Sequence, residues 1–229
     1  MADRRIIVAL DVSTATELRE IVKQIPNTHC RAKIGKELFT SIGPLAIEIC
    51  HDACLEVFLD LKFHDIPNTC AKAVRAAARW GVWMTNLHIS GGRDMMRAAR
   101  EILEGEAHRP LLIGVTVLTS LSESGLQELA FSRNLESQVD HLAGLAYASG
   151  LDGVVCSAQE TQRLRESFGA NFCLVTPGIR PSWFAADDQT RIVTPKDAIA
   201  NGSDYLVIGR PITVSDHPEE AIARIVEEL

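Results

Sequence analysis

The sequence predicts an α/β protein, a single-domain (β/α)8 TIM barrel that spans residues 1–229. Short apolar runs alternate along the whole chain with longer segments of helical periodicity, as the eight strand–helix units of this barrel require. Several runs are apolar throughout, which is typical of parallel strands buried on both faces. The length of 229 residues fits one such barrel, because these barrels run to about 200–250 residues as a single domain.

The strands are expected where β-branched residues and leucine cluster. The first contains the run IIVAL at Ile6–Leu10, and the fifth contains LLIGV at Leu111–Val115. The full set of expected strands is Arg5–Val12, Cys30–Gly35, Leu55–Lys62, Trp83–Ser90, Pro110–Thr119, Gly153–Ser157, Phe172–Gly178 and Tyr205–Ile212.

Helices are expected between these strands. Ser13 or Thr14 can cap a first helix that continues to Ile25, because a serine or threonine side chain accepts hydrogen bonds from free backbone N–H groups there. The other expected helices are Lys36–Cys50, Pro67–Trp80, Gly92–Leu103, Leu135–Ser149, Ala158–Phe168, Pro195–Asn201 and Pro218–Glu228, of which three begin with proline, a residue suited to the first turn.

A doubly wound open sheet is the alternative to the barrel. Its dinucleotide-binding version would place a G-x-G-x-x-G turn directly after the first strand. That strand ends with Asp11-Val12, and Ser13-Thr14-Ala15-Thr16 follows without a glycine. The sequence has no low-complexity tract and no composition change that would mark a domain boundary, so we expect one domain.

Charge and hydropathy exclude several partner classes. The formal net charge is −7, whereas a nucleic-acid or membrane-surface binder needs a basic face. No apolar run approaches the roughly 18 residues of a membrane span, and the first residues lack a signal-peptide pattern. We therefore expect a cytoplasmic protein with no nucleic-acid partner and no membrane association.

The cysteines do not predict a metal site. All six are scattered and none forms a C-x-x-C pair. Cys50 and Cys54 flank His51, but no second ligand pair follows, so zinc binding is not expected. Reduced and mostly buried thiols are the simpler interpretation.

Charged residues gather where the third expected strand ends. Asp60 and Lys62 are two positions apart, so both side chains should point to the barrel interior at its mouth. Asp65 follows, and Lys33 ends the second strand. Buried charges must pair, so we expect an alternating Lys–Asp array. A salt-bridge network that only closes the barrel is the alternative, but catalytic residues of such barrels lie at these strand ends.

A second set of polar residues indicates an anion site. Gly209 and Arg210 end the eighth strand and Arg180 follows the seventh, where barrels often bind phosphate. The polar segment from Pro181 to Arg191 is expected to be a lid. Asp11 ends the first strand, and a helix N-cap is an equally good explanation of that residue.

The segment Asp60–Thr69, DLKFHDIPNT, resembles the D-x-K-x-x-D-I-P-N-T signature of orotidine 5′-monophosphate decarboxylases. The similarity covers essentially the whole chain, including Ala9–Asp11, Lys33–Glu37, Val115–Ser120, Thr176–Pro181 and Val207–Pro211. The ordered set, with each piece at a strand end, makes the resemblance specific.

The resemblance implies decarboxylation of orotidine 5′-monophosphate to uridine 5′-monophosphate and CO2 without cofactor or metal, the last step of de novo pyrimidine nucleotide synthesis. As an ammonium, Lys62 is expected to stabilise the charge that develops at C6 and to protonate that carbon. Asp60 would lie near the departing carboxylate or orient Lys62, and Lys33 and Asp65 would complete the catalytic array.

The resemblance also implies the binding residues and a homodimer. Asp65 and Thr69 are expected to enter the site of the neighbouring subunit. The phosphate would be held by Arg180, Gln189, Gly209 and Arg210, the ribose by Asp11, and the base by Thr119 and Ser120, with Lys33 and Asp60 also in contact with the substrate. His64 is expected to be structural.

Two other functions remain as alternatives. Related barrels with an Asp-x-Lys-x-x-Asp core act on phosphorylated sugars and require Mg²⁺, so chelation would distinguish them. A nucleotide-binding barrel without activity would lack a member of the charged array, and all four residues, Lys33, Asp60, Lys62 and Asp65, are present.

Overall fold

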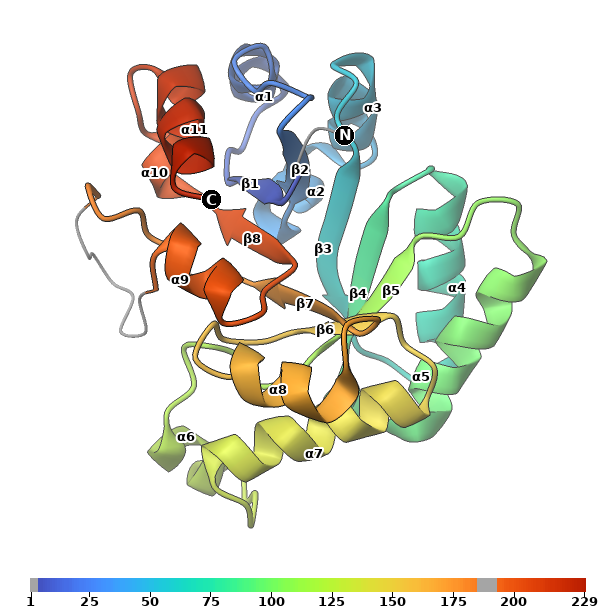
Figure 1. Cartoon of the computed structure of the whole chain (residues 1–229). Coiled ribbons are helices and arrows are strands. Elements are labelled where there is room, and N and C mark those ends of the chain that lie inside the picture. The colour runs from blue at the N-terminus through green and yellow to red at the C-terminus, as the bar shows by residue number, and fades with distance from the viewer. Residues whose placement is uncertain (1–3, 185–192) are drawn as a thin grey trace.

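A computed structural model describes residues 4–184 and 193–229, and its strands form a closed parallel barrel with sequential order β1 to β8. The predicted fold class is confirmed. Figure 1 shows the helices surrounding the strands. The strands are β1 (Ile6–Leu10), β2 (Cys30–Ile34), β3 (Val57–Phe63), β4 (Met84–His88), β5 (Leu111–Val115), β6 (Gly153–Val155), β7 (Cys173–Thr176) and β8 (Tyr205–Ile208).

The core has an inner part and outer parts that follow the strand alternation. Within β1, Ile7 belongs to a cluster that also contains Phe58, Met84 and Ile113 from other strands, which fills the barrel. Its neighbour Ile6 packs in a different cluster between the barrel and the helices. All five residues of β1 are buried, which explains why this strand has no polar face.

The α-helices are α1 (Ala15–Val22), α2 (Lys36–Ile42), α3 (Leu45–Asp52), α4 (Pro67–Arg79), α5 (Gly92–Glu101), α6 (Glu123–Glu128), α7 (Leu135–Ala148), α8 (Thr161–Phe168), α9 (Pro195–Ala200), α10 (Arg210–Thr213) and α11 (Pro218–Glu227). Two 3₁₀ helices, η1 (Ile89–Gly91) and η2 (Ile102–Gly105), flank α5. None of the helices in residues 4–184 and 193–229 combines the length and the apolar character that a bilayer span needs.

The prediction of one helix over Lys36–Cys50 was wrong. Gly43 has a φ of 61°, which ends α2, and Pro44 precedes α3. A left-handed glycine followed by proline interrupts helical hydrogen bonding. The predicted first helix also ends early, at Val22 rather than Ile25.

Two helices were not predicted. The eighth strand was expected to continue to Ile212, but it ends at Ile208 and α10 begins two residues later, with Pro211 in its first turn. The short helix α6 lies in the segment after β5, where the helical pattern spans too few residues to be recognised.

Thr14 is confirmed as the N-cap of α1. Its hydroxyl accepts from the backbone N–H of Glu17, whose carboxylate accepts from the backbone N–H of Thr14, which forms a capping box. The Thr14 hydroxyl also donates to the Glu17 carboxylate, and this hydrogen bond, with those from the backbone N–H groups of Ser13 and Thr14, lowers the pKa of Glu17. The N-cap explanation of Asp11 therefore fails, and its carboxylate is available for another role.

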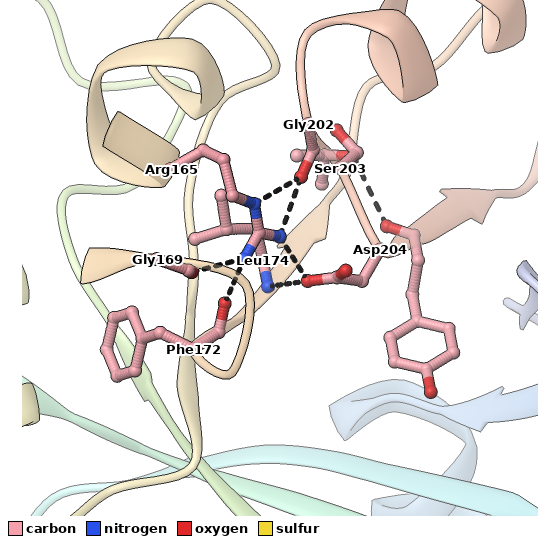
Figure 2. A network of polar contacts seen from close by, with 9 residues as sticks. Arg165, Gly169, Phe172, Leu174, Gly202, Ser203 and Asp204 are labelled. Atoms are coloured by element: carbon pink, nitrogen blue, oxygen red, sulfur yellow. Dashed lines mark hydrogen bonds and ion pairs between the residues drawn. The ribbon is translucent and has the colours of Figure 1, made fainter. Parts of the chain in front are cut away.

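Arg165 fastens the loops that precede β7 and β8 (Figure 2). Its guanidinium donates to the carbonyl oxygens of Gly169, Phe172 and Gly202 and to the carboxylate of Asp204, at 2.6 Å from Asp204 Oδ2. Asp204 in turn accepts from the backbone N–H of Leu174 at 2.7 Å. This network ties α8 to the amino ends of β7 and β8, whereas Arg180 and Arg210 follow the carboxyl ends of the same strands.

Candidate active site

A row of alternating charges lies at the carboxyl ends of β1, β2 and β3. Lys62 Nζ is 2.6 Å from Asp60 Oδ1, and Lys33 Nζ is 3.5 Å from Asp60 Oδ2. Lys33 Nζ also lies 3.6 Å from Asp11 Oδ1. The structure therefore brings together Asp11, Lys33, Asp60 and Lys62, all of which were predicted as site residues.

The charged groups of Lys33 and Asp60 need these ion pairs because both residues are buried. Lys33 and Asp60 are each only 8% exposed, so either charge alone would lose most of its hydration without compensation. The ammonium of Lys33 between two carboxylates, and the carboxylate of Asp60 between two ammonium groups, offset that loss. The side chain of Lys62 is 25% exposed and is the most accessible of the three at this point.

The strand that carries Asp60 and Lys62 is irregular. The register of β3 on β4 is regular up to Leu59, opposite Thr85, and then shifts so that Phe63 lies opposite Leu87. Lys62 has a φ of 53°, in the left-handed region. Simple alternation predicted that Asp60 and Lys62 face the same way. Their contact is present, but it is made across a bulge that re-aims the lysine.

Asn86 of β4 is a residue that the sequence analysis missed. It is fully buried, its Nδ2 donates to Asp60 Oδ1 at 2.7 Å, and its Oδ1 accepts from the backbone N–H of Lys62 at 2.8 Å. The available signal was one asparagine within a buried strand, directly opposite the charged end of β3, because a buried amide needs polar partners.

A cavity of about 190 Å³ opens beside the array. Lys33, Asp60 and Lys62 are its charged lining residues, and Thr119 also lines it. Its other lining residues are mostly apolar, namely Phe58, Val115, Val117, Leu118, Val155, Cys156, Pro177 and Val207. A small pocket with one charged wall and one apolar wall can hold a flat polar ligand and exclude water around it.

The glycines near the array provide space for it. A Cβ at Gly35 would lie 3.1 Å from Lys33 Nζ, and a Cβ at Gly209 would lie 3.6 Å from Asp11 Oδ2. Gly209, which precedes α10, was predicted as a site residue, and it lies beside the end of β1. A side chain at Gly35 would crowd the Lys33 ammonium, whereas a Cβ at Gly209 would be in ordinary contact with Asp11.

Two arginines lie next to each other in the barrel order. Arg180 follows β7 and is 5% exposed, and Arg210 is the first residue of α10 after β8. Because β7 pairs with β8, their carboxyl ends open on the same side of the mouth. Gln189, the third predicted phosphate contact, lies outside the described residues, as does most of the predicted lid.

Three predicted site residues lie away from the array. Asp65 and Thr69 are exposed, and within the described chain Asp65 makes no ion pair with Lys33 or Lys62. Ser120 is also exposed and does not line the cavity. Residues 65–69 follow β3 at the barrel mouth, and Ile66 among them is 68% exposed.

The histidines near the mouth form a pair. The rings of His64 and His88 are 5.7 Å apart and meet edge to face. Burial lowers the pKa of His88, and unfavourable electrostatic interactions with His64, Lys36 and Lys62 lower it further, so its imidazole is neutral at pH 7. His88 is not among the cavity-lining residues.

The cysteines are free thiols. Cys156 lines the cavity, and burial raises its pKa well above the usual value, so it remains protonated and is a poor nucleophile. Among residues 4–184 and 193–229, no group of three or more His, Cys, Asp or Glu side chains is arranged to hold a metal ion.

Comparisons with known proteins show which family this chain belongs to. The profile of the orotidine 5′-phosphate decarboxylase / HUMPS family matches residues 4–225. An orotidine 5′-phosphate decarboxylase of Hahella chejuensis is 58% identical over 98% of this chain and 97% of its own length. One from Vibrio cholerae is 54% identical over 100% of both chains.

Solved structures extend the likeness to three dimensions. The crystal structure of orotidine 5′-phosphate decarboxylase from Lactobacillus acidophilus superposes with a TM-score of 0.87 at 38% identity and covers 99% of both chains. The family profile, the related sequences and the solved structure all match almost the full length of the chain. The chain belongs to the orotidine 5′-phosphate decarboxylase family.

Proposed function

We infer that this chain catalyses the decarboxylation of orotidine 5′-monophosphate to uridine 5′-monophosphate and CO2, the last step of de novo pyrimidine nucleotide synthesis. The observation that supports it best is the Lys33–Asp60–Lys62 array on the wall of a small cavity, in a chain 58% identical to a decarboxylase of that name. Purified protein should form uridine monophosphate in an amount equal to the substrate consumed. A different product would contradict the inference.

The reaction needs a positive charge in one place. When the bond from C6 to the carboxylate carbon breaks, the electron pair stays at C6 in the plane of the ring, where no π system can accept it. A preorganised ammonium group can stabilise this charge. We propose that Lys62 does so, that its N–H proton forms the new C6–H bond, and that the resulting amine regains a proton from solvent.

Asp60 holds Lys62 in place for this step. Its Oδ1 accepts from Lys62 Nζ and from Asn86 Nδ2, and its Oδ2 lies 3.5 Å from Lys33 Nζ. A substrate carboxylate about 4 Å away would be repelled by about 4 kcal/mol at an effective dielectric constant of about 20. Both the repulsion of the substrate carboxylate and the orientation of Lys62 by Asp60 favour the reaction. The repulsion is relieved when CO2 leaves, whereas Lys62 stays oriented.

We propose that Asp65 and Thr69 complete the site of a second subunit in a homodimer. Their exposure, together with the exposed Ile66 between them, supports this role, because in this chain the carboxylate of Asp65 contacts only its neighbouring backbone N–H among the hydrogen bonds of the described residues. Each site would then contain Lys33, Asp60 and Lys62 from one chain and Asp65 from the other.

Mixing two inactive variants tests the shared site. Lys62→Ala and Asp65→Ala should each be inactive alone, but a mixed dimer contains one site with both native residues. After subunit exchange, random pairing should restore about a quarter of the wild-type activity. Refolding each variant separately is the control. Full activity of Asp65→Ala alone, or no recovery in verified mixed dimers, would refute this arrangement.

We propose that Arg180, Gly209 and Arg210 bind the phosphate, together with Gln189. Asp11 would accept hydrogen bonds from the ribose hydroxyls, and Thr119 and Ser120 would contact the base. Asp11 is exposed toward solvent but is held 3.6 Å from Lys33 Nζ, which connects the ribose position to the charged array. Binding energy from the phosphate can then be used to order the reacting groups.

Arg210→Ala should weaken binding of uridine monophosphate by about 10- to 100-fold, since a charge-assisted hydrogen bond contributes about 1.5–3 kcal/mol. Turnover should fall as well, because remote binding energy supports catalysis. Calorimetric titration with uridine monophosphate and with uridine checks this. The affinity for uridine should hardly change, and an unchanged affinity for the nucleotide would exclude the phosphate role.

We further propose that the enzyme needs no cofactor or metal and acts in the cytoplasm. The side chains of the array supply the charge and the proton that the reaction requires. The six cysteines are free thiols, as expected of a reducing compartment. The net charge of −7 favours a small nucleotide held in a local basic pocket over a nucleic-acid partner.

A further inference from the structure

The bulge in β3 leaves one residue of β4 opposite three residues of its neighbour. Leu59 pairs with Thr85 and Phe63 pairs with Leu87, so only Asn86 lies between these pairs to match Asp60, Leu61 and Lys62. A bulge interrupts the backbone ladder and leaves N–H and C=O groups without their regular partners. At this position the side chain of Asn86 replaces the missing backbone partner.

The orientation of the Asn86 amide is fixed by chemistry. The backbone N–H of Lys62 can only donate, so the atom 2.8 Å away must be the amide oxygen. The amide NH2 then points to Asp60 Oδ1 at 2.7 Å, where a carboxylate can only accept. The side chain of Asn86 is completely buried, so water does not compete for either hydrogen bond.

These two hydrogen bonds fix both ends of the catalytic ion pair. Asp60 Oδ1 receives the Asn86 NH2 and the Lys62 ammonium, which is 2.6 Å away. The backbone of Lys62, with its φ of 53°, is held by the Asn86 oxygen. A left-handed backbone conformation is unfavourable for lysine, so it persists only where the surroundings enforce it.

We propose that Asn86 is a positioning residue for decarboxylation, because one buried amide sets the direction of Lys62 and holds Asp60 against it. The inference rests on the proposed function of this site. Asn86 does not line the cavity, so it acts through Asp60 and Lys62 rather than by contact with the substrate. Its neighbour Thr85 is equally buried and also bonds to β3, through Leu59 O at 3.1 Å, but does not contact the array.

The test compares Asn86→Ala, Asn86→Asp and the control Thr85→Val in the full-length protein. Asn86→Ala should lower kcat by about 100-fold, as expected of a displacement of about 1 Å in a reacting group. The dissociation constant of uridine monophosphate should change less than about threefold, because no substrate contact is lost. Thr85→Val should lose thermal stability but keep kcat within about threefold of the wild type.

Asn86→Asp separates positioning from general stability. The introduced carboxylate can still accept from the Lys62 N–H, but it cannot donate to Asp60 and it repels that group. Once protonated it can donate again, and two adjacent carboxyl groups share one proton readily. The kcat of Asn86→Asp relative to the wild type should therefore rise as the pH falls from about 8 to about 5.

Each Asn86 variant can contradict the positioning role. A kcat of Asn86→Ala within about threefold of the wild type, or a pH-independent kcat ratio for a folded Asn86→Asp, would overturn the positioning role. If Asn86→Ala does not fold, the isosteric Asn86→Asp still decides the question. A wild-type protein that does not decarboxylate orotidine monophosphate would instead refute the proposed function, and with it this inference.

Discussion

Replacing Lys62 with alanine is expected to lower turnover of orotidine monophosphate by about 10⁴-fold or more while leaving the fold intact. Loss of a general acid costs about 10²–10⁴-fold, and loss of a preorganised charge costs about 10²–10³-fold more. The fold should survive because Asp60 keeps its hydrogen bond from Asn86 and its ion pair with Lys33. The partly exposed lysine itself fills little of the core.

Steady-state kinetics of Lys62→Ala, together with thermal unfolding and binding of uridine monophosphate, measure these effects separately. Lys72→Ala is the matched control, because Lys72 is an exposed lysine of α4 that takes no part in the charged array. That variant should retain wild-type kinetics. Turnover of folded Lys62→Ala within about tenfold of the wild type would remove Lys62 from the central role.

Replacing Gly153 with alanine is expected to destabilise the barrel strongly. Gly153 begins β6, between Ile113 of β5 and Cys173 of β7. An alanine Cβ there would lie 2.1 Å from the carbonyl oxygen of Cys173 and 2.6 Å from its Cβ. Both atoms belong to Cys173 of β7, which pairs on its other side with β8. The clash with the backbone oxygen therefore cannot be relieved by moving a flexible side chain.

The free energy of unfolding is expected to fall by more than about 4 kcal/mol. Single substitutions seldom have so large an effect, and a steric clash in the core is one of the causes. Urea unfolding followed by circular dichroism measures it. Gly144→Ala is the control, since a Cβ at that position of α7 would meet no atom within 4 Å apart from the adjacent residues and the backbone of its own helix. It should stabilise the helix by up to about 1 kcal/mol. Equal unfolding midpoints for both variants would contradict the predicted clash.

The sequence predicted the strands better than it predicted the helices. Parallel strands buried on both faces leave apolar runs such as Ile6–Leu10, which few other structures produce. The break between α2 and α3 depended on Gly43 and Pro44, two residues inside an otherwise periodic segment. Helix α10 has too few residues to produce a periodic pattern, so the eighth strand was predicted too long.

The charged residues of the site were predicted, but their geometry was not. Charges at the ends of apolar strands are costly to bury, so Lys33, Asp60 and Lys62 were conspicuous. The positive φ of Lys62 and the register shift of β3 depend on contacts with β4 that no local pattern encodes. Asn86 was missed for the same reason, because its partners are 24 and 26 positions away in the chain.

The exposed residues Asp65 and Thr69 could not be assigned to a site from the pattern of one chain. The resemblance implied that both residues act in a neighbouring subunit, and their exposure in this chain agrees with that proposal. Strand periodicity cannot predict an interface between subunits, since it reports only which face of an element is buried. Activity of mixed dimers is therefore needed to establish the composition of each site.

The most direct test of catalysis by this charged array is the consumption of orotidine monophosphate by the purified protein, followed by ultraviolet absorbance with excess EDTA present. We expect rapid and complete conversion to uridine monophosphate at the same rate with and without the chelator. No conversion by a folded protein, or conversion that depends on restoring a divalent cation such as Mg²⁺, would contradict a mechanism in which Lys62 alone supplies the charge and the proton.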